Sequence, residues 1–206
     1  MKKNIVCRKC RRSGEKLFLK GDKCLGPKCP FAKRPYAPGV HGQMRRRLSE
    51  YGTQLKEKQK AKNIFFLTEE RFKRIFEKAQ KDKGNAGLAL VLGLEMRLDN
   101  IVFRLGMAQS RRLARQMITH GHILLNGKKV DIPSVKMKVN DEVSVNTKSL
   151  EKPLFIAVKE LFGSKPVPGW LEQNEKDLSG KVKALPTREQ MESLVDESAI
   201  IEYYSR

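Results

Sequence analysis

The sequence lacks any long apolar run. No stretch approaches the roughly 20 consecutive apolar residues that a helix needs to cross a membrane. The first seven residues have neither a long apolar core nor a small-residue cleavage site, so we expect no secretory signal. The basic segments are interrupted by Cys, Pro and Gly, which argues against a basic helix lying on a membrane surface. We therefore expect a cytoplasmic protein with no membrane partner.

The sequence patterns of common catalytic sites are also missing. Residues 1–93 and 147–206 contain no Gly-rich phosphate loop, no Ser/His/Asp arrangement and no cluster of paired acids. There is no internal repeat and no long low-complexity linker. The chain is therefore predicted not to be an enzyme and to take no small-molecule substrate.

Acidic residues are scarce. The chain has 23 Asp and Glu against 43 Lys and Arg, giving a formal net charge of +20. Residues 1–62 hold 19 of these basic residues and 4 of the acidic ones, so +15 of the excess lies in the first third of the chain. So dense a block of one sign repels itself unless a polyanion lies against it, and each neutralised phosphate releases counterions. The charge therefore predicts a nucleic-acid partner.

All four cysteines lie within the first 29 residues: Cys7, Cys10, Cys24 and Cys29. Two close pairs that bracket a loop can place four thiolates around Zn²⁺ at about 2.3 Å. Zinc is the cofactor that this spacing favours, and an iron–sulfur cluster is the alternative. Two disulfides are disfavoured in a reducing compartment, and His41 is a weaker candidate ligand.

Residue periodicity predicts an α+β fold. Helices are expected over 49–62, from Thr68, from Asn85, over 94–105, over 110–120 and over 150–162. Residues 123–130 read as a hairpin around Asn126-Gly127, followed by a strand over 139–145. A short strand is expected at 171, and Thr187 with Gln190 has the spacing of a capping box for a last helix.

These elements divide the chain into four parts. Residues 1–44 are expected to form a loop-built four-cysteine metal knuckle and basic loop, and 45–94 a helical domain. Residues 95–160 are expected to form a helix-turn-helix followed by a β-hairpin. Residues 161–206 are expected to pack back on the body of the protein.

Within residues 97–129 the chain closely resembles the RNA-binding motif named after small-subunit ribosomal protein S4. The shared pattern is Arg97-Leu98-Asp99-Asn100, Arg104-Leu105-Gly106, Ser110-Arg111-Arg112, Ala114-Arg115-Gln116, His120-Gly121-His122-Ile123 and Asn126-Gly127-Lys128. The same motif occurs in tyrosyl-tRNA synthetases and pseudouridine synthases, so alone it indicates only an RNA-binding module.

The flanking segments are similar to the ribosomal family itself, in its zinc-bearing four-cysteine bacterial branch. They are 34–43, 55–60, 167–171 and 202–206. The resemblance implies a structural protein of the small ribosomal subunit. It would bind the five-prime domain of small-subunit rRNA at a helix junction early in assembly, contact neighbouring ribosomal proteins, help to line the mRNA entry path and contribute to translational accuracy. Repression of its own mRNA is a further possibility.

RNA duplexes are read through shape, phosphates and 2′-hydroxyls, so the expected contacts are basic side chains. The candidates are Arg45, Arg46, Arg47, Lys56, Arg111, Arg112, Arg115, His120, Lys128 and Lys129. For His120 and His122, which flank a turn glycine, RNA contact and a structural role remain equally open.

Two other classes of protein remain as alternatives. An RNA-modifying enzyme or synthetase carries the same motif but needs a catalytic domain, which the patterns above do not indicate. A zinc-dependent DNA-binding regulator would place a readout helix in the major groove, and the chain has neither finger-like Cys/His spacing nor a heptad zipper.

Overall fold

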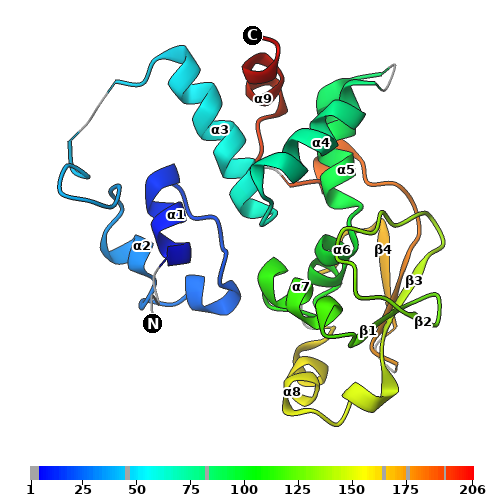
Figure 1. The fold of residues 1–206 in the computed structure, drawn as a ribbon. Helices are drawn as coiled ribbons and strands as arrows, with labels where there is room; N and C mark the ends of the chain where they lie inside the picture. The colour runs from blue at the N-terminus through cyan, green and yellow to red at the C-terminus, as the bar shows by residue number, and fades with distance from the viewer. Residues whose placement is uncertain (1–4, 45–46, 82–83, 164–165, 175–176, 193) are drawn as a thin grey trace. The chain divides into compact units, whose positions relative to one another are not determined.

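The structure, a computed structural model, describes residues 5–44, 47–81, 84–163, 166–174, 177–192 and 194–206. It divides into two compact units (Figure 1). The first unit is formed by residues 1–90 together with 194–206, and the second by residues 91–193. No helix within the described ranges is long and apolar enough to cross a membrane.

The first unit is helical where the structure describes it. Its elements are α1 (Ile5–Ser13), the 3-10 turn η1 (Gly21–Cys24), α2 (Pro30–Lys33), α3 (Glu50–Ile64), α4 (Glu69–Gln80) and α9 (Glu197–Tyr204). Helix α5 (Ala86–Glu95) begins in this unit and ends in the second. The C-terminal helix α9 packs against α3, and Tyr204 stacks on Phe76 of α4 with ring centroids 4.3 Å apart.

Side-chain caps account for several of these helix starts. Ser49 accepts a hydrogen bond from the Gly52 N–H at the start of α3. Asn85 Oδ1 accepts from Gly87 and Leu88 at the start of α5, at 2.9 and 3.2 Å. Each of these bonds satisfies a backbone donor that the first helical turn leaves without a partner. The starts predicted near residues 49 and 85 are thereby confirmed.

The second unit combines helices with one antiparallel sheet. Its helices are α6 (Leu98–Arg104), α7 (Arg111–Thr119), α8 (Pro153–Leu161) and the 3-10 turns η2 (Thr147–Ser149) and η3 (Arg188–Gln190). The strands are β1 (Ile123–Leu125), β2 (Lys128–Lys129), β3 (Glu142–Val145), β4 (Leu171–Asn174) and β5 (Ser179–Val182), in the spatial order β2-β1-β3-β5-β4. A helical first unit and a second unit of helices and sheet agree with the predicted α+β class, although the second unit is not the smaller of the two.

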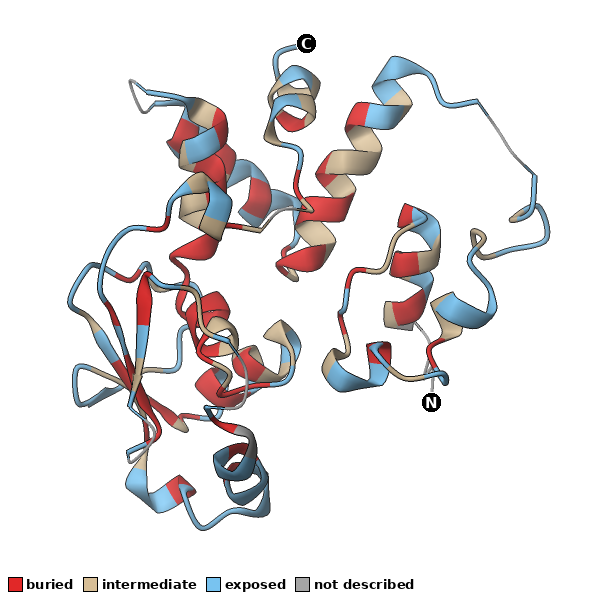
Figure 2. Ribbon diagram, turned by 180° about the vertical axis from the view of Figure 1, so that it is seen from behind, coloured by how far each residue is buried: buried red, intermediate tan, exposed pale blue. Residues whose placement is uncertain are grey.

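The core of the second unit lies between the sheet and helices α6 and α7 (Figure 2). Leu98 and Ile101 of α6, Met117 of α7 and Val143 of β3 are fully or almost fully buried there. Trp170 joins them immediately before β4. Burial of a large apolar side chain contributes about 1.5 to 3 kcal/mol. This core therefore fixes α7 and the β1–β2 hairpin against each other.

The prediction that residues 1–44 are built from loops was wrong for residues 5–13 and 30–33, which are helical. Helix α1 carries Cys7 and Cys10, and α2 follows Cys29 directly. Cys7, Cys10 and Ser13 are all buried and recur every three residues, which is a helical spacing. The helical spacing of buried positions is thus present in the sequence, but cysteine and serine occupy these positions in place of the usual aliphatic residues.

The helix predicted over 94–105 is interrupted at residues 96–97. Met96 and Arg97 pair with a neighbouring segment instead of continuing the helix. The Met96 carbonyl accepts from the Met137 N–H at 2.8 Å, and Arg97 forms an isolated bridge with Lys136. Leu94 therefore belongs to α5, and α6 begins only at Leu98.

The C-terminal region differs from the expectation in two ways. The boundary expected at residue 161 falls inside the second unit, because β4 and β5 extend the sheet beside β3. The capping box at Thr187 and Gln190 is present but starts only the turn η3. The last helix is α9, and Asp196 caps it by accepting from the Ser198 and Ala199 N–H groups.

Candidate nucleic-acid interface

Helix α7 presents a basic side opposite its buried side. Ser110 caps the helix by accepting from the Leu113 N–H at 3.3 Å. Ala114, Met117 and Ile118 are buried against the core. Arg112 is exposed. The predicted helix is therefore confirmed, and its core-facing register leaves the Arg112 side toward solvent.

A left-handed glycine ends α7 and directs the chain into the sheet. Gly121 has φ +71°, its N–H donates to the Ile118 carbonyl at 2.8 Å, and the His122 N–H donates to the Met117 carbonyl at 3.0 Å. This bonding pattern is the Schellman motif, in which a glycine satisfies the last helix carbonyls. The motif brings β1 back alongside the helix and sets His120 and His122 on either side of the turn.

The hairpin places two lysines near this turn. Asn126 and Gly127 have φ +49° and +75°, as a type I′ turn requires. Lys128 and Lys129 follow in β2, pair with Leu125 and Leu124 of β1, and are exposed. The Lys129 side chain lies over Gly121, where a Cβ atom would collide with it. A lysine of β2 and the end of α7 thus share one surface.

His122 lies at the edge of this surface, between a polar and an aromatic neighbour. Its Nδ1 lies 2.9 Å from Ser149 Oγ, and its ring meets Phe155 edge-on at 5.5 Å. Burial, followed by the positive charges of Lys152, His120 and Lys129, lowers the pKa of His122 below its usual value. His122 is therefore mostly neutral at pH 7, whereas the lysines around it carry the positive charge.

Arg111 is held differently from Arg112. Its Nε donates to Asn100 Oδ1 at 2.8 Å, and its Nη2 pairs with Glu192 Oε2 at 2.7 Å. The guanidinium also lies over the Phe103 ring at 4.6 Å, and its side chain is only 11% exposed. The structure therefore brings Arg111 into a polar network within the second unit.

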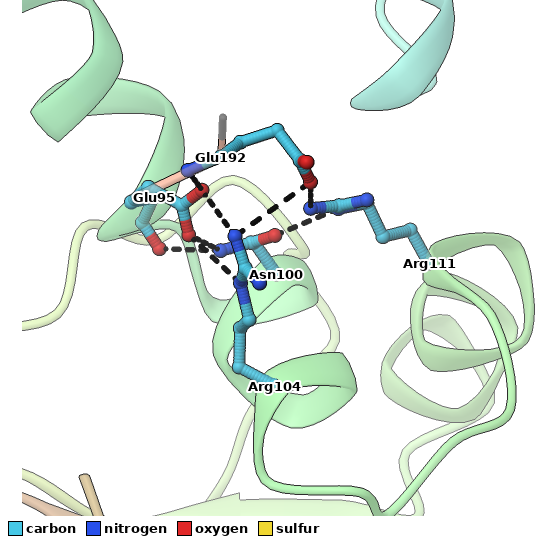
Figure 3. Close-up of polar contacts among 5 residues, drawn as sticks. All are labelled: Glu95, Asn100, Arg104, Arg111 and Glu192. Carbon is cyan, nitrogen blue, oxygen red and sulfur yellow. Dashed lines mark hydrogen bonds and ion pairs between the residues drawn. The ribbon is translucent and has the colours of Figure 1, made fainter. Parts of the chain in front are cut away.

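Two acidic residues and Arg104 complete this network (Figure 3). Glu95 is fully buried and accepts from Arg104 Nη2 at 2.8 Å and from Asn100 Nδ2 at 2.6 Å. The backbone N–H of Glu192 also donates to Glu95, at 3.1 Å. Burial alone would lower the pKa of Arg104, but the charges of Glu95 and Glu192 raise it above its usual range. The Arg104 guanidinium therefore stays charged.

No pattern in the sequence indicated Glu95 or Glu192 as partners of these arginines. Glu95 follows an apolar run, and Glu192 lies 81 residues beyond Arg111. The S4-type motif did point to this region, because it contains Asn100, Arg104 and Arg111.

The first unit also contains predicted contact residues. Arg47 is exposed, and Lys56 is half-buried on α3, whereas Arg45 and Arg46 lie outside the described residues. Two other lysines of α3 are buried and serve the fold. Lys58 pairs with Glu69, and Lys60 pairs with Glu57 at 2.6 Å. Helix α3 therefore divides its lysines between internal ion pairs and the surface.

The four cysteines are all buried, with exposed fractions of 5–7%. Burial raises the pKa of Cys10 and of Cys24, a backbone N–H from Leu17 or Lys20 lowers it, and the neighbouring thiols raise it further. Even so, no three His, Cys, Asp or Glu side chains in the described part of the chain are arranged as a metal-binding group.

Comparison with known proteins identifies the family. Residues 2–95 match the family described as Ribosomal protein S4/S9 N-terminal domain, and residues 96–143 match the S4 domain. The chain is 54% identical over 200 residues to small ribosomal subunit protein uS4 of Caldicellulosiruptor saccharolyticus, covering 97% of this chain and 96% of that one. The chain belongs to the uS4 family.

Two further uS4 proteins extend this relationship. The uS4 protein of Caldicellulosiruptor bescii is 52% identical, and that of Acetivibrio thermocellus is 51% identical. Each alignment covers 97% of this chain and 96% of the relative. The similarity to uS4 proteins therefore spans both units, including the helical unit that precedes the S4 domain.

Proposed function

We propose that the protein is a structural constituent of the small ribosomal subunit that binds small-subunit rRNA. The observation that carries this proposal is the 54% identity to a small ribosomal subunit uS4 protein over 97% of the chain. The net charge of +20 supports it, because a structural protein that packs against rRNA must neutralise phosphates. The work of such a protein is binding, and no reaction is assigned to it.

The basic surface of the second unit is suited to an RNA helix. Arg112, His120, Lys128 and Lys129 are exposed, and α7 also carries Arg115. Arginine can bridge phosphate oxygens with two parallel hydrogen bonds, whereas lysine acts as a point charge. Phosphate and 2′-hydroxyl contacts of this kind recognise the shape of RNA, which suits a structured rRNA target.

The first unit adds a second basic region. The proposed contacts there are Arg45, Arg46, Arg47 and Lys56, within a segment where basic residues far outnumber acidic ones. The rRNA site that we propose is a helix junction in the five-prime domain, bound early in assembly. We also propose that the protein contacts neighbouring ribosomal proteins and mRNA near the entry path. In that position it would contribute to translational accuracy.

We also propose that Cys7, Cys10, Cys24 and Cys29 hold a structural Zn²⁺. Four thiols that are all buried, in two close pairs along the chain, form a donor set that zinc prefers. The Lys20 N–H donates to Cys24 Sγ at 3.3 Å, a contact that favours a thiolate. Bound zinc would cross-link α1 to the segment 24–29.

Metal analysis tests the zinc proposal. Purified protein should contain one Zn²⁺ per chain, and a strong chelator should lower its thermal stability and release four reactive thiols. The variant Cys24→Ser should lose the metal, whereas Ser13→Ala on the same helix as Cys7 and Cys10 should retain it. Visible absorbance with stoichiometric iron would indicate a cluster instead. Four free thiols with no metal would refute the proposal.

A binding titration tests the rRNA proposal. The protein should bind the five-prime domain of small-subunit rRNA tightly and saturably in the presence of bulk tRNA, and its affinity should fall steeply as salt rises. Duplex DNA at matched salt should compete poorly. If tRNA removes the protein as easily as rRNA does, the protein is a generic basic RNA binder. Detection of RNA modification would point to the enzyme alternative.

A further inference from the structure

The charged network of the second unit joins parts of the chain that are far apart in the sequence. Glu95 ends α5, Arg104 ends α6, Arg111 begins α7, and Glu192 follows η3 (Figure 3). Glu95 accepts hydrogen bonds from Arg104, Asn100 and the Glu192 backbone. Arg104 Nη2 also lies 3.6 Å from Glu192 Oε2. The network therefore ties the segment at Glu192 to three helices.

Arg111 is the member that connects α7 to the network. Two of its donors are engaged, by Asn100 at 2.8 Å and by Glu192 at 2.7 Å. The flat guanidinium is covered on one face by Phe103. Two carboxylates and two guanidinium groups give the network no net charge. Arg111 therefore adds no uncompensated positive charge to the RNA-binding side of α7.

A phosphate that approached the Nη2 side of Arg111 would compete with Glu192 for the guanidinium. The Glu192 side chain is 14% exposed, and without Arg111 its carboxylate would be held less well beside the fully buried Glu95. Removing one partner of such a pair costs more than the pair contributes, because a charge is left without compensation in a poorly hydrated place. Arg112, the next residue along the chain, is exposed and offers a phosphate its guanidinium at the helix surface.

We propose that Arg111 is a positioning residue that makes no phosphate contact. Glu192 and Asn100 hold its guanidinium inside the second unit and thereby set the orientation of α7. Phosphates are then bound by Arg112 of the same helix, whose side chain is exposed. This inference rests on the proposed function, since it concerns which arginines of α7 meet rRNA, and it replaces the expectation that Arg111 is itself an RNA contact.

The salt dependence of binding separates the two arginines. Each lost phosphate contact flattens the plot of log affinity against log salt by roughly 0.7 to 0.9. Arg112→Gln should flatten the slope by about that amount and leave the melting temperature unchanged. Arg111→Gln should lower the melting temperature and leave the slope of the remaining folded protein unchanged. The reverse pattern would overturn the inference.

Glu192→Gln provides the decisive second variant if Arg111→Gln does not fold. Glu192→Gln should lower the melting temperature. It should tighten rRNA binding no more than the matched control Glu189→Gln does, because that variant also removes one negative charge, from an exposed residue three positions earlier. If Arg111 bound phosphate, removal of its competitor would tighten binding and steepen the slope beyond that control. The double variant Arg111→Gln/Glu192→Gln should lose less stability than the two single losses added together.

The two proposals fail in different ways. If the unaltered protein does not prefer rRNA to tRNA, the proposed function fails. The stability losses of the single and double variants would still show whether Arg111 and Glu192 interact in the folded protein. If the unaltered protein binds rRNA specifically but Arg111→Gln flattens the slope as Arg112→Gln does, only the positioning role fails.

Discussion

Gly121 is the residue on which the geometry of the basic surface depends. Its φ of +71° lies in the left-handed region, where a side chain with a Cβ atom is strained. The sequence predicted that the helix ends at Gly121, because a glycine that follows a helical pattern commonly ends a helix. The position of Lys129 over this glycine could not be predicted from the sequence, because it depends on the register of the hairpin.

Substituting this glycine should weaken the fold. We expect Gly121→Ala to lower the free energy of unfolding by about 1 kcal/mol, because alanine must adopt a left-handed conformation. Gly84→Ala is the matched control, since Gly84 is exposed, has no positive φ and has no atom near its would-be Cβ. Denaturant titration of both variants measures the difference. Equal losses would contradict the assigned role of Gly121.

His122 gives the second prediction at this scale. Because its pKa is lowered in the folded protein, the unfolded chain binds a proton more readily than the folded one below the ordinary value of about 6.5. The free energy of unfolding should therefore fall as the pH drops below about 6.5. His122→Gln should reduce this decrease in the free energy of unfolding at low pH. Substitution of the exposed His41 by Gln should leave the decrease unchanged. An NMR titration that gave His122 a raised pKa would contradict the explanation.

At the scale of helices and strands, local signals predicted starts and turns better than they predicted lengths. Ser110, Asn85 and Asn126-Gly127 each act through neighbours a few residues away, so the sequence contains the whole cause. The break at Met96 has a distant cause, because the Met137 N–H competes for its carbonyl. Strands β4 and β5 likewise depend on pairing with β3.

Two helix caps allow a direct comparison. Ser110 bonds the Leu113 N–H at the start of α7, whereas Thr68 at the start of α4 forms no side-chain capping bond. Ser110→Ala should therefore cost about 1 kcal/mol of stability, and Thr68→Ala should cost clearly less. Thermal unfolding of the two variants distinguishes them. A larger loss for Thr68→Ala would mean that the observed bonds do not govern these helix starts.

On the scale of the whole molecule, the first unit takes its helices from both ends of the chain. Helix α9 contacts α3, Tyr204 stacks on Phe76, and Gln54 donates to Glu202 at 2.9 Å. The sequence indicated that residues 200–204 would dock, because they are apolar enough to avoid fraying. It did not indicate that the preceding residues, up to 193, would belong to the other unit.

Deletion of residues 194–206 should destabilise the first unit selectively. Loss of α9 uncovers Phe76 and leaves Gln54 without Glu202, whereas the second unit keeps all of its residues. Hydrogen exchange should show reduced protection in α3 and α4, with α6 and α7 unchanged. Deletion of Ser205 and Arg206 alone, which leaves α9 intact, is the control. Equal loss of protection in both units would contradict this division.

The discontinuity of the first unit also has a consequence during synthesis. Residues 91–193 form one uninterrupted stretch, so the second unit has all of its parts as soon as that stretch leaves the exit tunnel. The first unit must wait for residues 194–206, although most of it was made earlier. The unit whose residues emerge first is therefore completed last, because α3 and α4 lack their contacts with α9 until α9 has left the exit tunnel.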